Sequence, residues 1–227
     1  MASGRWVLSV KERIKEWLVK VKEEGRPVEV ITFYQEIPIR VKTKLLDFDD
    51  NFLQWEAEPK LCLGVSDCGR LYFYFFDPYY GQKRLLSAEV NYHGSSMVET
   101  TFPKPSQEPR LNRESLRVKT SESLPVKAFV IEGEGKKEFK VWDVSEEGIG
   151  IVGEPGSLNP GEEVRLELRL PQGELCVRGE VVSAQPEEEG ERYGIKLLIK
   201  ENEKKLLRSY VMARQREVLN KIREVAG

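Results

Sequence analysis

The sequence predicts a mainly β protein built from two small antiparallel β-barrels in tandem, with an amphipathic helix at each end of the chain. Three observations support this fold class. Apolar residues recur every three or four positions near both ends, they alternate with polar residues over most of the length between, and a proline-rich stretch divides the alternating region in two. A chain of 227 residues is long enough for two modest domains, each with its own core.

The first element is a helix, because apolar residues at helical spacing are separated by Lys and Glu. These apolar positions are Trp6, Val7, Val10, Ile14, Trp17, Leu18 and Val21. The segment Gly25-Arg26-Pro27 ends the pattern. Since the polar face mixes both charge signs, we expect the helix to pack on its own domain; a membrane-surface or partner-binding face is the alternative.

Alternation with period two then predicts the strands of the first barrel or sandwich. The runs are Val28 to Tyr34, Ile37 to Leu46, Phe52 to Ala57, Leu71 to Phe76 and Leu85 to Tyr92. The aromatic run from Tyr72 to Phe76 is interpreted as a core strand with an aromatic outer face. A platform that stacks nucleic-acid bases is the alternative, disfavoured because no Lys or Arg is interleaved.

A domain boundary is predicted where three prolines fall within the eight residues from Phe102 to Pro109, since neither a helix nor a central strand continues through them. The predicted domains are residues 1–102 and 110–227, with residues 103–109 as the linker. Six further strands indicate the second barrel: Val126 to Ile131, Glu138 to Asp143, Ile149 to Val152, Glu163 to Leu170, Glu174 to Val182 and Arg192 to Ile199. Helical spacing from Leu206 to Val225 ends the chain.

The composition of the chain argues against several classes of function. The formal net charge is −2 despite 36 Lys and Arg residues, so we expect no nucleic-acid partner and no general attraction to anionic membranes. No apolar run approaches the roughly 20 residues that span a bilayer, so no membrane insertion is expected. Cys62, Cys68 and Cys176 match neither a zinc site nor a disulfide framework, which favours reduced thiols in the cytoplasm. The single histidine, His93, lacks accompanying nucleophile or metal-ligand spacing, so neither an enzyme nor a metal site is predicted.

Two short motifs lie near the beginning of the second barrel. Arg113 and Arg117 form R-x-x-x-R, and residues 143–148 form D-x-S-x-x-G. The first pattern is common, since Arg165 and Arg169 supply another pair. The second is expected by chance in roughly one chain in twenty of this composition. Their order and separation therefore point to one binding site.

The chemistry of these residues suits a guanine-containing cyclic dinucleotide. Guanidinium groups bind phosphate bidentately and also read the O6 and N7 edge of guanine. On an extended strand, Asp143 and Ser145 are expected to face the ligand, while Trp142 and Val144 face the other way. The carboxylate would accept from guanine N1 and N2 hydrogens, and the hydroxyl would bond phosphate or backbone. Gly148 would provide a positive φ or a close backbone approach; an ordinary Asx-type turn is the alternative for the whole segment.

With both motifs in place, residues 110 to about 200 resemble the PilZ domain family, whose six-stranded barrel binds cyclic di-GMP through these patterns. The resemblance implies that the cyclic di-GMP-binding residues are Arg113, Arg117, Asp143, Ser145 and Gly148. Many members have another arginine immediately before the first motif, where this chain has Asn112, and Arg110 is the arginine that would replace it. Residues 1–102 are similar to the split-barrel-like N-terminal domain of YcgR-type proteins.

The resemblance implies a bacterial, cytoplasmic receptor that is not an enzyme and has no cofactor besides its ligand. It implies that nucleotide binding is coupled to interdomain rearrangement and to regulation of a protein partner, in flagellar, pilus or exopolysaccharide machinery. The alternative is a PilZ-like interaction or scaffold protein that does not bind nucleotide.

Overall fold

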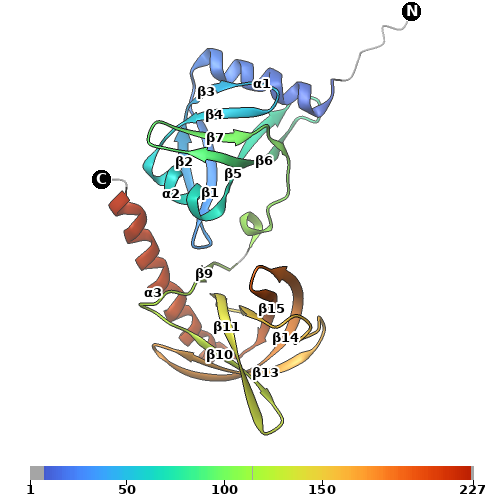
Figure 1. The fold of residues 1–227 in the computed structure, drawn as a ribbon, viewed down its shortest axis with the longest axis vertical. Coiled ribbons are helices and arrows are strands. Elements are labelled where there is room, and N and C mark those ends of the chain that lie inside the picture. Colours follow the sequence, from blue (N-terminus) through green and yellow to red (C-terminus); the bar gives the residue numbers. More distant parts are fainter. Residues whose placement is uncertain (1–7, 114, 226–227) are drawn as a thin grey trace, which may run out of the picture. The chain divides into compact units, whose positions relative to one another are not determined.

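The computed structural model describes residues 8–113 and 115–225, and its internal contacts divide the chain into two compact units (Figure 1). The first unit contains the described residues up to Tyr34, residues 38–112 and the described residues from Ile222 onward; the second contains residues 35–37 and 113–221. This division places the expected linker, residues 103–109, in the first unit. The domain ranges of the sequence analysis stay a prediction.

The first unit is an antiparallel sheet with two helices. Its elements are α1 (Val10–Glu24), β1 (Val28–Tyr34), β2 (Ile37–Thr43), β3 (Leu45–Phe48), β4 (Phe52–Glu56), α2 (Pro59–Cys68), β5 (Arg70–Asp77), β6 (Gln82–His93), β7 (Met97–Thr101), β8 (Lys104–Pro105) and a 3-10 turn, Pro109–Asn112. The strand order is β2-β1-β5-β6-β7-β4-β3, with β8 paired to β6. Among the described residues β2 and β3 are the two ends of this order, so the sheet is a half-barrel.

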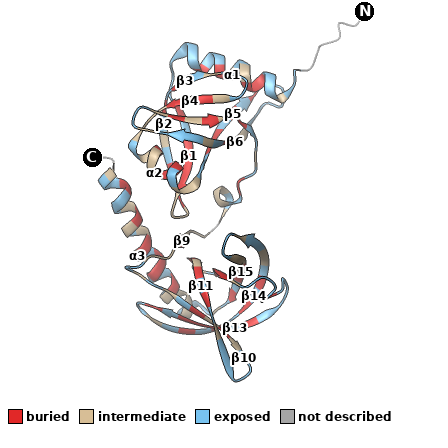
Figure 2. Ribbon diagram, viewed as in Figure 1, coloured by how far each residue is buried: buried red, intermediate tan, exposed pale blue. Residues whose placement is uncertain are grey.

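Helix α1 packs on the core of its own unit, as the mixed charge of its polar face predicted. Its buried residues include Ile14, Leu18 and Val21, which join the core cluster of the sheet. Trp17 stacks on Phe73 with 5.8 Å between ring centres. The opposite side of α1 is exposed (Figure 2). Burial of one apolar stripe, rather than intrinsic helix propensity, therefore stabilises this helix.

Helix α2 was not predicted, and its sequence explains why. The segment is only ten residues long and contains Gly64 and Ser66, which are weak helix formers. The glycine is required by packing: a Cβ at Gly64 would lie 2.2 Å from the Cγ2 atom of Thr32 in β1. Strands β7 and β8 were also missed, and the single strand expected from Ile37 to Leu46 is divided between β2 and β3.

The second unit contains the closed barrel. Its elements are β9 (Arg117–Lys119), β10 (Lys127–Glu132), β11 (Gly135–Ser145), β12 (Gly148–Gly153), β13 (Glu163–Leu170), β14 (Gly173–Glu187), β15 (Gly190–Leu198) and most of α3 (Glu201–Val225). The order is β10-β13-β14-β15-β12-β11-β9, and β10 also pairs with β11. Six strands therefore close on themselves and β9 adds to β11. The predicted mainly β fold with a six-stranded C-terminal barrel is confirmed.

Helix α3 is attached to β9 and to the loop between β9 and β10 by polar contacts from its buried side. The Tyr210 hydroxyl donates to the carbonyl oxygen of Leu124 at 3.0 Å, and Arg214 Nε donates to that of Lys119 at 2.9 Å. Burial raises the pKa of Tyr210 to about 12, so this hydroxyl stays protonated and donates at neutral pH. Among the described residues, no helix is both long enough and apolar enough to cross a lipid bilayer.

Candidate functional site

Strand β9 brings the two motifs together by pairing with the end of β11. In this antiparallel register Arg117 lies opposite Ser145, and Lys119 lies opposite Asp143. The guanidinium of Arg117 contacts the Asp143 carboxylate, with 3.5 Å between Nη1 and Oδ1. Residues 26 positions apart in sequence thus become neighbours. Strand β9 was not predicted from the sequence, whereas a single site formed by the two motifs was.

The carboxylate of Asp143 is fully buried and has a second partner, Arg192 of β15. Arg192 Nη2 donates to Oδ2 of Asp143, while Arg117 contacts the other oxygen. The side chains of Arg117 and Arg192 remain 30% and 21% exposed. A buried acceptor that holds two partly exposed guanidinium groups restricts their rotamers and leaves their other N–H groups available to an anion.

Trp142 lies near two cations beside this carboxylate. The Arg192 guanidinium carbon and the Lys119 ammonium are each 5.3 Å from the centre of its ring. We call Asp143, Arg117, Arg192, Lys119 and Trp142 the Asp143 cluster. It contains three cations and one carboxylate, so its net charge is positive and suits a phosphate-bearing ligand.

Regular alternation along the strand predicts that Trp142 faces away from Asp143, but a β-bulge breaks this alternation. The register between β11 and β12 shifts between Val141 and Asp143, which places one extra residue, Trp142, on the β11 side. Asp143, Val144 and Ser145 are then all buried instead of alternating. Among the described residues, the buried Nε1 of Trp142 has no hydrogen-bond acceptor.

Ser145 and Gly148 form the turn between β11 and β12. The Ser145 hydroxyl donates to the Gly148 carbonyl oxygen at 3.2 Å. Of the two partners expected for this hydroxyl, phosphate or backbone, the structure shows the backbone. A Cβ at Gly148 would lie 3.0 Å from the Ile195 carbonyl oxygen, and one at Gly150 would lie 2.9 Å from Oδ1 of Asp143. Close approach, rather than a positive φ, is therefore the reason for glycine at position 148.

Arg113 is held by a different acid. Its Nη1 atom lies 2.8 Å from Oε2 of Glu36, and its side chain is 27% exposed. Both residues belong to the second contact unit. The structure therefore brings Arg117, Asp143, Ser145 and Gly148 together, whereas Arg113 is paired with Glu36.

Arg110, the expected replacement for the missing arginine, is bound within the first unit. Its guanidinium carbon lies 3.8 Å from the centre of the Phe33 ring, and it donates to Glu108 at 2.8 Å and to the Tyr72 hydroxyl at 3.2 Å. Burial opposes ionisation of Glu108, but hydrogen bonds from Arg110 and Tyr72 outweigh it and lower the pKa to about 2. Burial, with the bond to Glu108, raises the pKa of Tyr72 to about 12. Asn112 ends the 3-10 turn that contains Arg110.

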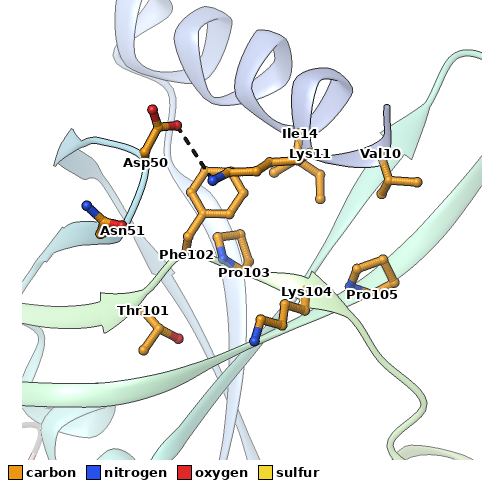
Figure 3. A pocket seen from close by; sticks show the side chains of 10 residues that line it. All are labelled: Val10, Lys11, Ile14, Asp50, Asn51, Thr101, Phe102, Pro103, Lys104 and Pro105. Atoms are coloured by element: carbon orange, nitrogen blue, oxygen red, sulfur yellow. Dashed lines mark ion pairs between the residues drawn. The ribbon is translucent and has the colours of Figure 1, made fainter. Parts of the chain in front are cut away.

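A cavity of about 460 Å³ in the first unit contains none of the predicted site residues (Figure 3). It lies between the first turns of α1 and the segment that follows β7. Lys11 contacts Asp50, with 3.8 Å between Nζ and Oδ1, and its ammonium lies 5.1 Å from the centre of the Phe102 ring.

Cys62, Cys68 and Cys176 are free thiols. Within residues 8–113 and 115–225, no group of three or more His, Cys, Asp or Glu side chains is arranged to hold a metal ion.

Arg192 and Trp142 were not predicted as site residues. The signals available in the sequence were weak: an arginine at the beginning of the last strand, and a tryptophan immediately before the D-x-S-x-x-G motif. Neither indicates that the two side chains meet, because β15 becomes the neighbour of β12 only when the barrel closes.

The closed six-stranded barrel, with a cationic cluster beside its added strand, is a small β-barrel domain. Residues 108–213 match the model of the PilZ domain. This segment, a little under half of the chain, is therefore similar to PilZ domains.

Other comparisons extend over both units. An uncharacterized protein from Aquifex aeolicus is 25% identical over 223 residues, with 91% of this chain and 95% of that protein covered. The structure of YcgR from Escherichia coli in complex with c-di-GMP is 13% identical, covers 95% of each chain and has a TM-score of 0.48. The K. pneumonia MrkH–c-di-GMP complex is 14% identical, covers 92% of this chain and 93% of that chain, and has a TM-score of 0.45.

Proposed function

We propose that this chain is a receptor for cyclic di-GMP and that the Asp143 cluster, together with Arg113, forms the binding site. The observation that supports the proposal most directly is the meeting of the two PilZ-type motifs, in which the Arg117 guanidinium contacts the Asp143 carboxylate. The alternative, a PilZ-like scaffold that does not bind nucleotide, is disfavoured because every motif residue is present. The solved YcgR and MrkH structures named above are complexes with this ligand.

The arrangement supports a division of roles. Arg113 and Arg117 bind the phosphates and the guanine edge, and Arg192 adds a third guanidinium. Asp143 is fully buried, and its oxygens already accept from two arginines. We therefore propose that Asp143 mainly orients these arginines, and that its direct contact with guanine is secondary. The exposed part of the Trp142 ring offers a surface on which a base stacks.

Isothermal titration calorimetry of the full chain tests ligand binding. We expect cyclic di-GMP to bind at micromolar affinity or tighter, and to bind more weakly as salt is added, because exposed guanidinium groups attract a dianion. Cyclic di-AMP and GTP are the matched controls, one with a different base and one without the cyclic phosphodiester. Equal affinity for cyclic di-AMP would contradict guanine recognition, and no heat from cyclic di-GMP at any salt concentration would favour the scaffold alternative.

We further propose that ligand binding rearranges the two domains. Arg113 and Arg117 follow directly after residues 103–112, which belong to the first unit, so capture of these arginines acts on the chain between the units. A ligand shifts such an equilibrium only by its differential affinity for two arrangements. Fixing the segment costs about 1–2 kcal/mol per residue, so only a short stretch is a plausible switch.

Hydrogen exchange and small-angle scattering, with and without cyclic di-GMP, test the rearrangement. We expect new protection in residues 103–113 and 115–118 and a changed scattering profile. Arg117→Ala with the same nucleotide is the matched control and should show neither change. Protection confined to residues 143–148, with an unchanged profile, would mean that the domains do not respond.

The proposed output is regulation of a protein partner in flagellar, pilus or exopolysaccharide machinery. Motility and exopolysaccharide production in a deletion strain, complemented with the natural chain or with Arg117→Ala, test this step. Identical phenotypes for the two complemented strains would reject it.

A further inference from the structure

A second cationic site lies on the closed barrel and shares no residue with the Asp143 cluster. Arg165 of β13 and Arg178 of β14 are directly opposite each other in the antiparallel register, and both side chains are exposed. Like charges in directly opposite positions destabilise a sheet pair, by about 1.4- to fivefold in the folding equilibrium constant. A negatively charged partner would offset this repulsion.

The described residues do not provide that partner. Neither guanidinium has a hydrogen bond or an ion pair with another side chain of residues 8–113 and 115–225. The next pair along the same strands, Glu163 opposite Glu180, consists of acids but forms no ion pair with the arginines. Glu167, on the other side, is already bound by Lys136 and Arg169.

Both arginines line a cavity of about 440 Å³, whose other lining residues include Ile131, Leu198, Lys200 and Glu203. In the sheet register Ile131 lies opposite Arg165, and Leu198 lies opposite Arg178, so aliphatic side chains flank both guanidinium groups. Apolar neighbours lower the local dielectric and strengthen attraction to an anion.

The charges of the lining select among anions. Three cations, Arg165, Arg178 and Lys200, face one carboxylate, Glu203, which already accepts from the Lys200 backbone N–H at 2.8 Å. The net charge of +2 matches a phosphomonoester, whose charge at neutral pH is about −1.5 to −2. A diphosphate carries still more negative charge and is also attracted. A phosphodiester has only one negative charge per phosphate and fits less well.

We propose that this cavity binds the phosphate group of a small molecule, a phosphomonoester or diphosphate, with Arg165 and Arg178 sharing its oxygens. Two planar guanidinium groups on adjacent strands satisfy several phosphate oxygens at once, and the bound dianion converts their repulsion into attraction. The cavity volume is in the range that holds a small ligand. A free nucleotide and an anionic lipid with a terminal phosphate, such as phosphatidic acid, both present this chemistry.

Denaturant unfolding of the full chain, with pyrophosphate or inorganic phosphate and with ionic strength matched by chloride, tests the site. At about 100 times its Kd, a bound anion lowers the unfolded-to-folded ratio roughly 100-fold. Arg165→Ala and Arg178→Ala should lose this response, and without the anion they should be as stable as the natural chain or more stable, because the like-charge pair is gone. Arg40→Ala, an exposed arginine of β2 paired with Glu29, is the control and should keep the full response.

Three results would overturn the proposal: no stabilisation of the natural chain by pyrophosphate, a full response in Arg165→Ala, or loss of cyclic di-GMP affinity in Arg165→Ala equal to that in Arg117→Ala. The last result would assign Arg165 to the other ligand, so failure here is distinguishable from failure of the receptor proposal. GMP in solution and vesicles containing phosphatidic acid test whether the phosphate belongs to a free nucleotide or to a lipid headgroup. Stabilisation by GMP supports a free nucleotide, and arginine-dependent flotation with the vesicles supports a lipid headgroup.

Discussion

Arg113→Ala or Arg117→Ala is expected to weaken cyclic di-GMP binding about five- to 150-fold, which corresponds to about 1–3 kcal/mol per lost bidentate contact. The Arg117 guanidinium is fixed against a fully buried carboxylate, so little side-chain entropy remains to be lost on binding. Arg113 has to give up its ion pair with Glu36 to bind the ligand, so its net contribution to affinity is smaller. We therefore expect Arg113→Ala to lose less affinity than Arg117→Ala. Calorimetry of each variant measures both values.

Two further variants separate a specific site from general charge. Arg117→Lys keeps the charge but not the planar fork of donors, so its affinity should lie near that of Arg117→Ala. Arg40→Ala removes an equal charge from an exposed arginine of the first unit and should leave the affinity within about twofold. An equal loss in Arg40→Ala and Arg117→Ala would show that the ligand responds to net charge, and the site would be misassigned.

Asp143→Ala is expected to lower the free energy of unfolding by about 1–3 kcal/mol and to weaken cyclic di-GMP binding as well. Removing the carboxylate leaves Arg117 and Arg192 without their shared acceptor. Losing one partner of a fully buried pair costs about 3–5 kcal/mol, but the partial exposure of both arginines reduces this cost. Denaturant unfolding measures the stability, and calorimetry on the folded variant measures the affinity.

Asp47→Ala is the matched control for stability, because Asp47 pairs with Lys22 where the two side chains are 58% and 44% exposed. An exposed ion pair of this kind contributes about 0–1 kcal/mol. Asp143→Asn keeps the shape and one acceptor oxygen, so it should lie between Asp143→Ala and the natural chain. If Asp143→Ala unfolded at the same denaturant concentration as the natural chain, the proposed orienting role would be wrong.

The sequence by itself determined the mainly β fold class, helix α1, the six strands of the closed barrel and the two motifs at its entrance. These features could be predicted because each depends on residues that lie within a few positions of one another in the sequence. Helical spacing places α1 residues such as Leu18 on one buried stripe, and alternation places Val164, Leu166 and Leu168 of β13 on the inner face. The D-x-S-x-x-G motif located Asp143, Ser145 and Gly148 for the same reason.

Only the tertiary structure decided which residues these motifs meet. Arg192 reaches Asp143 because barrel closure places β15 beside β12. Trp142 is turned by a bulge in the separate pairing of β11 with β12. Arg110 is bound instead by Phe33, Tyr72 and Glu108, two of which are far from it in sequence. Strand register and side-chain packing are set by contacts between distant segments, and a pattern confined to neighbouring positions does not contain them.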